Sequence, residues 1–132
     1  SALDSKLKGM ARANVSSGPA ISQAIVLEAL NDPNLEAEQS ALLEQCAERY
    51  RTLKRCLLEA NIPHEPFNSG FFALIPVADS AEALRLKLLE QGVGVVSLPK
   101  LGAIRIAYSS TSVDDIPTLV DTIAQNLGSA AE

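Results

Sequence analysis

The chain has 132 residues, of which 47% are hydrophobic and 20% charged, and it carries a formal net charge of −5. This length and composition are typical of a globular domain with a single core, and they exclude a disordered or fibrous chain. The charge shows no basic run, which argues against nucleic-acid and membrane partners, and no transmembrane-length apolar run or export signal is present, so we expect a cytoplasmic protein.

The first half of the chain predicts long helices. Residues 1–18 show little pattern, but the serines that precede Pro19 are typical of a helix start, and the helix that follows should end at the Asn-Asp-Pro of residues 31–33. Between residues 34 and 60, apolar side chains recur at spacings of three, four and seven. This periodicity predicts one amphipathic helix of roughly 40 Å, which is longer than a small domain needs.

The second half alternates between strand and helix signals. Strands are predicted at FFALIP (71–76), GVGVVSL (92–98) and AIRIAY (103–108), and a short loop joins the last two. Apolar side chains at helical spacing separate the first strand from the second and follow the third. The order of elements in this half is therefore β-α-β-β-α.

Two pairs of side chains have the spacing of a helix capping box. Asp79 and Glu82 are expected to open the helix after the first strand, and Ser112 and Asp115 the last helix. The whole order predicts an α/β fold: N-terminal helices, then β-α-β-β-α with the helices on one face of a small, mostly antiparallel sheet.

Arg105 stands out because it places a full positive charge within the third predicted strand. Strand alternation puts Ile104, Ile106 and Tyr108 on one face and Arg105 on the other, between two alanines. One interpretation is a solvated surface arginine. The other is an anion site, since a planar guanidinium on a rigid strand with small neighbours suits bidentate capture of a carboxylate.

Cysteine and histidine give no sign of a disulfide or a metal site. Cys46 and Cys56 lie ten residues apart on the long predicted helix, about 15 Å by helical rise, which is too far for a disulfide. The chain has one histidine and no Cys/His cluster at ligand spacing, so we expect no bound metal.

Four segments together resemble a known enzyme family. The stretches PFNSGFFALIPV (66–77), LLEQGVGVVSL (88–98) and AIRIAYSSTSVDDIPTLVDTI (103–123) are similar to the C-terminal small domain of the class I/II pyridoxal-phosphate-dependent aminotransferases of fold type I. Residues 7–35 resemble the family segment that leaves the large domain. Each piece is weakly specific alone, but their order and spacing extend over nearly the whole chain.

The resemblance implies both a domain division and a function. Residues 1–33 would be the segment leaving a large domain that is absent here, and residues 34–132 the small domain with its long linking helix. The parent would be a homodimeric aminotransferase that moves an amino group between an amino acid and a 2-oxo acid with pyridoxal 5'-phosphate as cofactor. By the same resemblance, Arg105 would bind the α-carboxylate of the substrate.

Arg12 and Phe72 are further candidates from the resemblance. Arg12 matches a family arginine that reaches across the dimer to a second substrate carboxylate, but Val15 and Ser17-Gly18 depart from that motif. A surface or capping role is therefore the alternative for Arg12. Phe72 would border the substrate cavity or contact the dimer partner, and a core aromatic is the alternative for Phe72.

The family's Schiff-base lysine has no counterpart in this sequence. It belongs to an S-x-x-K segment upstream of the motif that Arg12 matches, and no lysine of this chain has that context. The chain is therefore expected to be an inactive C-terminal fragment that contains no catalytic lysine and binds no cofactor covalently. The lysines are Lys6, Lys8, Lys54, Lys87 and Lys100.

Other functions remain compatible with the residues. A free-standing small-molecule-binding or regulatory module could have the same β-α-β-β-α layout, a dimerisation element could use the long helix, and a lyase or a transcription regulator could share the fold. The fragment itself is expected to self-associate, because Ile21, Ile25 and Leu30 form an apolar stripe that would otherwise be left uncovered.

Overall fold

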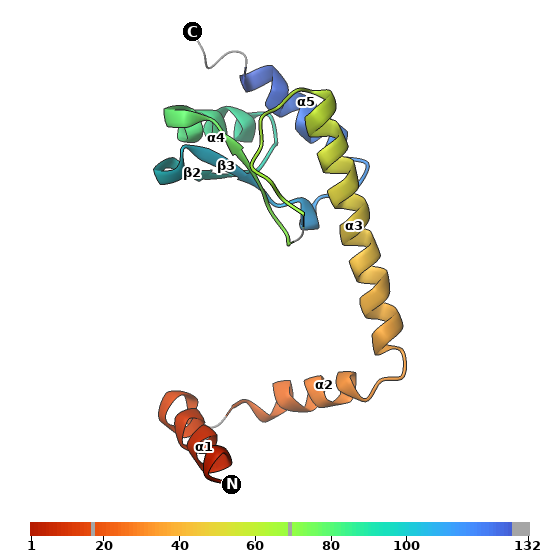
Figure 1. Cartoon of the computed structure of the whole chain (residues 1–132), viewed down its shortest axis with the longest axis vertical. Coiled ribbons are helices and arrows are strands. Elements are labelled where there is room, and N and C mark those ends of the chain that lie inside the picture. Colours follow the sequence, from red (N-terminus) through yellow and green to blue (C-terminus); the bar gives the residue numbers. More distant parts are fainter. Residues whose placement is uncertain (17, 69, 128–132) are drawn as a thin grey trace. The chain divides into compact units, whose positions relative to one another are not determined.

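The structure is a computed structural model, and it describes residues 1–16, 18–68 and 70–127 (Figure 1). The chain divides into two compact units, Ser1–Ala41 and Leu42–Glu132. The first contains two helices and the start of a third, and the second contains the described strands.

The first unit contains α1, Ala2–Val15, and α2, Ala20–Leu30, and ends within α3, Leu35–Glu59. Pro19 is the N-cap of α2 and has extended backbone, so this helix begins one residue after the predicted start. The long helix predicted from residue 34 to 60 is confirmed by α3. The sequence pattern did not predict α1, which is capped by Ser1, whose Oγ accepts a hydrogen bond from the Asp4 amide at 3.2 Å.

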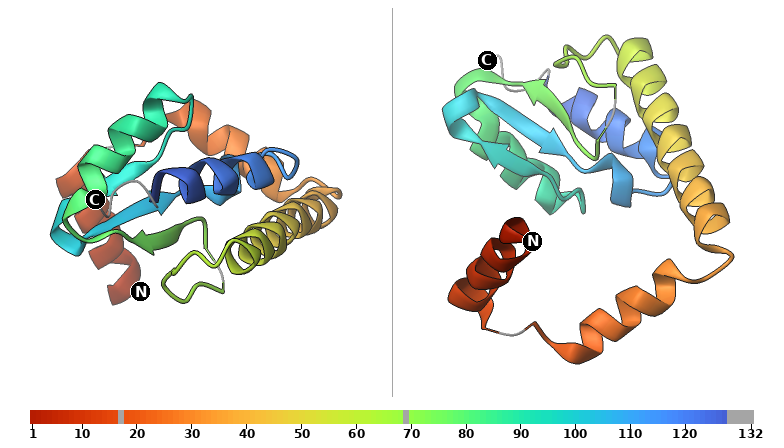
Figure 2. Two further views of the ribbon diagram at one scale, coloured as in Figure 1. Left: turned by 90° about the horizontal axis from the view of Figure 1, so that it is seen from above. Right: turned by 60° about the horizontal axis from the view of Figure 1, so that its bottom comes forward.

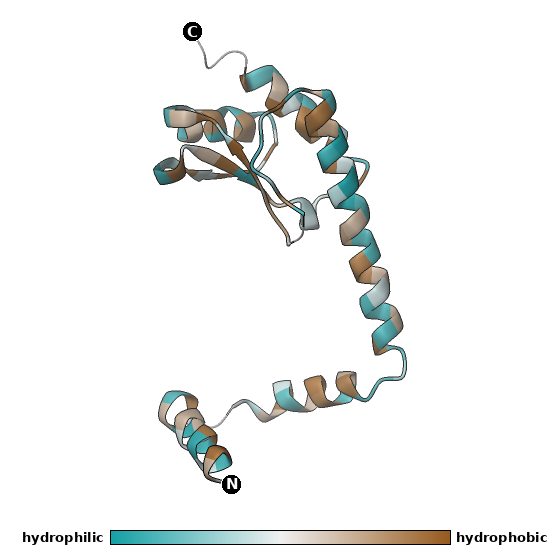
Figure 3. Ribbon diagram, in the orientation of Figure 1, coloured by the Kyte–Doolittle hydropathy of each residue, from teal (hydrophilic) through white to brown (hydrophobic). Residues whose placement is uncertain are grey.

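Neither α1 nor α2 has a buried residue. Large apolar side chains on both helices are more than half exposed, and α2 is coloured as hydrophobic along much of its length in Figure 3. The exposed side chains are Leu3, Leu7, Met10, Val15, Ile21, Ile25, Val26, Leu27 and Leu30. Short helices have little intrinsic stability in water and are stabilised mainly when their apolar side chains pack against other apolar groups. Packing against an apolar surface would therefore stabilise both α1 and α2.

The second unit is built on a three-stranded antiparallel sheet (Figure 1). Its strands are β1, Ala73–Pro76, β2, Val96–Leu98, and β3, Ala103–Ile106, in the spatial order β1-β3-β2. The predicted antiparallel sheet is confirmed, and β3 is its central strand. The strands are shorter than the predicted stretches; after β3, for example, the chain turns into a 3₁₀ segment, Tyr108–Ser110.

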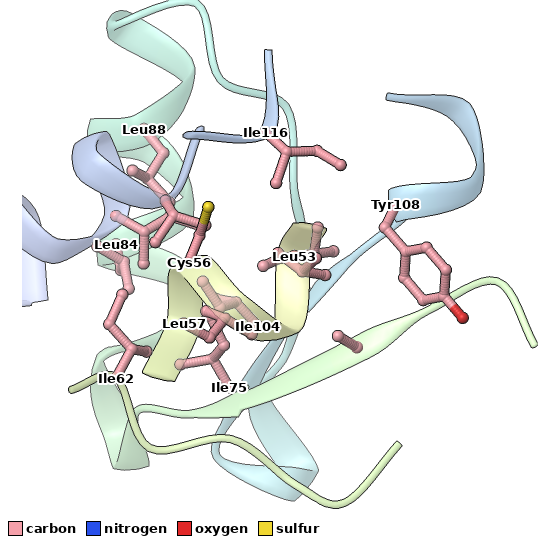
Figure 4. Close-up of a cluster of buried hydrophobic side chains, with 14 of the residues drawn as sticks. Leu53, Cys56, Leu57, Ile62, Ile75, Leu84, Leu88, Ile104, Tyr108 and Ile116 are labelled. Atoms are coloured by element: carbon pink, nitrogen blue, oxygen red, sulfur yellow. The ribbon is translucent and has the colours of Figure 1, made fainter. Parts of the chain in front are cut away.

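Helices α3, α4 and α5 supply the other side of the core. Helix α4 is Ala81–Glu90 and α5 is Ile116–Leu127, and the two lie side by side in Figure 2. Their inner side chains meet the isoleucines of the sheet and the last turns of α3 (Figure 4). The largest fully buried side chains are Leu53, Leu57, Ile75, Leu84, Leu88, Ile104, Ile106, Tyr108, Ile116, Val120 and Ile123.

One of the two predicted capping boxes is wrong. A 3₁₀ turn, Ala78–Ser80, precedes α4, whose N-cap Ser80 makes no side-chain capping bond, and Glu82 pairs with Arg85 at 2.6 Å instead. The guanidinium has several donors in one plane, which outcompete a single backbone amide for the carboxylate. The other box is present in part: the Ser112 Oγ accepts from the Asp115 amide at 3.2 Å, but the Asp115 carboxylate accepts from the Ser112 hydroxyl at 2.8 Å instead of the Ser112 amide. Helix α5 begins at Ile116, directly after Asp115.

Candidate functional site

Arg105 lies in the middle of the central strand. In the sheet register it stands opposite Leu74 of β1 and Val96 of β2. Its strand neighbours Ile104 and Ile106 are 0% and 2% exposed and face the core, whereas Arg105 is half-buried on the other face. The predicted alternation of β3 is therefore confirmed, and both flanking strands hold the backbone of Arg105 in place.

Phe72 lies over the guanidinium of Arg105. The centre of its ring is 4.2 Å from the Arg105 Cζ, which is a close cation–π contact. Extending the β1–β3 register by one residue places Phe72 opposite Ala107, so Phe72 is the diagonal neighbour of Arg105 on the same face of the sheet. Aromatic and long side chains can bridge this diagonal, and the small Ala107 leaves room for the ring.

The Arg105 guanidinium has no ion-pair partner among the described residues. Its Nε is buried and has no hydrogen-bond partner within residues 1–16, 18–68 and 70–127. No carboxylate in the described part of the chain forms an ion pair with Arg105. A half-buried guanidinium without an ion-pair partner can bind a carboxylate through two parallel charge-assisted hydrogen bonds.

A second set of contacts fixes the backbone where β1 begins. The Tyr108 hydroxyl donates to the Gly70 carbonyl at 2.8 Å, and the Ser109 amide donates to the Phe71 carbonyl at 3.5 Å. Arg49 of α3 donates to the carbonyl of Ser109. These bonds tie the segment before Phe72 to the end of β3 and to the long helix.

Tyr108 is almost entirely buried, with 1% of its surface exposed. Its ring packs with Phe67, which in turn contacts Tyr50, and its hydroxyl points away from the aliphatic core (Figure 4). Burial raises the pKa of the Tyr108 phenol above its ordinary value, and the neighbouring Cys46 and Tyr50 raise it further. Tyr108 therefore stays protonated and keeps its bond to Gly70.

These supporting contacts were missed at the sequence level. The Arg49 side chain binds the carbonyl of Ser109, 60 positions along the chain, and the Tyr108 hydroxyl binds the carbonyl of Gly70, 38 positions away. A backbone acceptor has no residue type, so it leaves no motif. The only available signal was the strand alternation, which placed Tyr108 with Ile104 and Ile106 on the core face.

Arg12 lies in the last turn of α1 and is exposed. It borders a shallow hollow formed by side chains of its own helix, including Ser5 and Lys8. Two of the positions that differ from the family motif are Val15, which is 64% exposed, and Ser17, which lies outside the described residues. The surroundings of Arg12 within α1 give it no ion pair in the described part of the chain, and its predicted substrate role stays a prediction.

The lysines and cysteines lie on helices or turns. Every lysine is exposed, and Lys54 of α3 donates to the Tyr50 hydroxyl at 3.1 Å. Cys46 and Cys56 are both on α3, and both are free thiols. Over the described ranges, no cluster of His, Cys, Asp and Glu side chains could hold a metal ion, and no helix is both long and apolar enough to cross a bilayer.

Comparison with known proteins gives one family and several similar folds. The model of the family "Aminotransferase class I and II" matches residues 1–123. An aminotransferase from Anaerococcus prevotii DSM 20548 is 27% identical with a TM-score of 0.79, over 93% of this chain and 30% of that one. Comparison with curated proteins gives no significant match.

Two further solved structures support the fold alone, because their identities are low. The aromatic aminotransferase from Pyrococcus horikoshii is 18% identical with a TM-score of 0.74, over 92% of this chain and 35% of that one. The α-aminoadipate aminotransferase from Thermus thermophilus, solved with N-(5'-phosphopyridoxyl)-L-leucine, is 17% identical with a TM-score of 0.75, over 91% and 34%. The chain spans about a third of the length of these three proteins.

Proposed function

The chain belongs to the class I and II aminotransferase family, and we propose that it is the C-terminal, substrate-binding part of a transaminase. In this proposal residues 1–33 leave the large domain and residues 34–132 form the small domain. The whole enzyme transfers an amino group between an amino acid and a 2-oxo acid, acts as a homodimer, and works in the cytoplasm. Family membership and the likeness to solved aminotransferases support this assignment.

The observation that carries the proposal is the Arg105 guanidinium, which has no ion-pair partner in the described part of the chain. It is held on the central strand, on the face away from the core, and its Nε has no partner among the described residues. Every amino-acid substrate and every 2-oxo-acid product of a transaminase has a carboxylate next to the reacting carbon. By binding that carboxylate with two donors, Arg105 fixes both the position and the rotation of the reacting carbon.

The cofactor, pyridoxal 5'-phosphate, carries the amino group when it is bound to the whole enzyme. The residues of this chain alone do not provide a covalent site for it. A Schiff-base lysine needs a lowered pKa, which burial or a neighbouring cation would provide, but every lysine here is exposed on a helix or a turn. We therefore assign the covalent cofactor site to the rest of the enzyme. The chain alone is then inactive, and borohydride reduction in the presence of the cofactor labels no lysine stoichiometrically.

Arg12 and Phe72 have lesser parts in the proposal. Arg12 contributes to substrate binding or to the dimer contact through its exposed side chain on α1. Phe72 borders the substrate site next to Arg105. Arg105 alone is given the role of carboxylate-binding residue.

Substitution of Arg105 in the full-length enzyme tests the proposal. Removing one partner of a desolvated charge pair costs on the order of 2–5 kcal/mol, so Arg105→Ala is expected to lower kcat/KM by roughly 30-fold to several-thousand-fold. Arg105→Lys recovers part of this loss, because an ammonium keeps the charge and loses the planar fork. Melting temperatures stay near wild type, since Arg105 faces away from the core. Unchanged turnover in Arg105→Ala would return Arg105 to a surface role.

A further inference from the structure

We propose that Phe72 is a positioning residue that acts through Arg105, orienting the guanidinium while leaving its hydrogen-bond donors free for a carboxylate. This inference rests on the proposed function. It assigns to Phe72 a contribution that neither contact with the substrate nor packing in the core would make.

The contact between the Phe72 ring and the guanidinium explains why a ring does what a carboxylate could not. All the N–H donors of a guanidinium lie in its plane, and the Arg105 Cζ lies over the Phe72 ring, 4.2 Å from its centre, so the ring contacts the cation without accepting a conventional hydrogen bond. An Asp or Glu partner would hold Arg105 equally well, but it would occupy the in-plane donors that the substrate needs. No such partner pairs with Arg105 within the described ranges.

The burial of Phe72 argues against a core role. Its side chain is 44% exposed, whereas the aromatic residue of the core, Tyr108, is 1% exposed. The exposed ring instead contacts the Arg105 guanidinium, and it makes a T-shaped contact with its chain neighbour Phe71, whose ring centre is 6.4 Å away. An aromatic side chain that remains this exposed gains little from burial, so its contact with the cation is the interaction that distinguishes it.

The backbone that carries the ring is held independently of the ring itself. The carbonyls of Gly70 and Phe71, directly before Phe72, accept hydrogen bonds from the Tyr108 hydroxyl and the Ser109 amide. Leu74, two residues further along, pairs with Arg105 in the sheet. Phe72 is therefore fixed on both sides along the chain, and replacing its side chain should leave the strand in place.

Kinetics of the full-length enzyme test the inference through three single variants. Phe72→Leu keeps an apolar side chain of similar bulk and removes the π face, so kcat/KM for the amino acid is expected to fall roughly 3- to 30-fold. Phe72→Tyr keeps the ring and stays within about twofold of wild type. Phe71→Leu, the matched control, changes an exposed neighbouring ring that does not cover Arg105, and it also stays within about twofold.

A double variant separates positioning from direct contact with the substrate. If Phe72 acts through Arg105, then adding Phe72→Leu to Arg105→Ala causes no further loss, because the group that it orients is already gone. A full additional loss in the double variant would overturn the inference, and so would equal losses in Phe72→Leu and Phe71→Leu or a wild-type rate in Phe72→Leu. If Arg105→Ala alone leaves turnover unchanged, the proposed function fails instead, which keeps the two failures distinct.

Discussion

The buried Nε of Arg105 is the most unusual feature at the scale of single residues. A buried donor without a partner costs about 1–3 kcal/mol, and most native structures avoid it. Arg105 lies on a face of the sheet where an apolar residue would carry no such cost. An arginine kept at this cost, with no ion-pair partner among the described residues, fits a site whose partner is a ligand rather than another residue of the chain.

The sequence predicted the face of the strand on which Arg105 lies, but it did not predict the residues that contact Arg105. Strand alternation depends only on local spacing, so it placed Arg105 away from Ile104 and Ile106 as observed. The stacking of Phe72 depends on the register of two strands and on two rotamers. Neither the register nor the rotamers can be predicted from local spacing. The sequence analysis therefore predicted a substrate or dimer contact, or core packing, for Phe72, but not its contact with Arg105.

Tyr108 provides a prediction of pH dependence. Its folded-state pKa is raised by burial above the unfolded value of about 10, so the stability that it contributes is complete below about pH 10 and is lost as the pH rises through the folded pKa. The melting temperature of the wild-type protein should therefore fall more steeply above pH 10 than that of Tyr108→Phe. At neutral pH, Tyr108→Phe loses the bond to Gly70 and about 1 kcal/mol of stability. Parallel melting curves of the two proteins above pH 10 would contradict this account.

At the scale of elements, two turns meet closely at one end of the sheet. Gly102, between β2 and β3, has a φ of +57°, and Ala78, after β1, has a φ of +51°. The amide of Val77 donates to the Gly102 carbonyl at 2.7 Å. A Cβ on Gly102 would lie 3.2 Å from both the Cα and the carbonyl oxygen of Ala78. The pairing of the two turns therefore depends on glycine at position 102.

This contact predicts the effect of a single methyl group. Gly102→Ala should lower the free energy of unfolding by about 1–3 kcal/mol, because it adds left-handed backbone strain and a tight contact with the Ala78 backbone. Gly94→Ala is the matched control, since no atom lies within 4 Å of its added Cβ. Chemical denaturation measures both variants. A Gly102→Ala variant as stable as Gly94→Ala would show that the two turns can separate at little cost.

Element boundaries show where local patterns stop being informative. The long periodic stretch of α3 was predicted to within one residue at each end, because its spacing repeats over many turns. Helix α1 was not predicted, although Leu3, Leu7 and Met10 recur at spacings of four and three; its serine cap and exposed Lys8–Asp4 pair add no apolar period of their own. The Asp79–Glu82 box was wrong because Arg85, one turn along, pairs with Glu82.

At the scale of the whole molecule, the order and spacing of the sequence segments indicated the family. They did not show what covers the apolar side chains of α1 and α2, which are exposed in the structure. Ile21 and Ile25 of α2 are 77% and 64% exposed. In the proposed enzyme the large domain or the second subunit covers these helices. The sequence of this chain could not specify that cover, because the relatives that it resembles are about three times as long.

The exposed faces predict that the purified 132-residue chain self-associates. Sedimentation should show a dimer or larger species at micromolar concentration. Replacing both Ile21 and Ile25 by Lys should shift the chain toward monomer, because two charges on one helix face disfavour its burial. A matched pair of lysine substitutions at the polar, exposed Gln23 and Glu28 should leave the association unchanged. A wild-type chain that stays monomeric over a hundredfold range of concentration would contradict the prediction.

The most direct measurement of the central claim compares two substrates that differ by one group. Transamination of an amino acid and of the corresponding amine, which lacks the α-carboxylate, is measured with wild-type full-length enzyme and with Arg105→Ala. If Arg105 binds the carboxylate, wild-type enzyme prefers the acid strongly, and Arg105→Ala loses most of that preference by losing turnover of the acid while retaining turnover of the amine. An Arg105→Ala enzyme that slows both substrates equally, or that keeps the wild-type preference, would contradict the account.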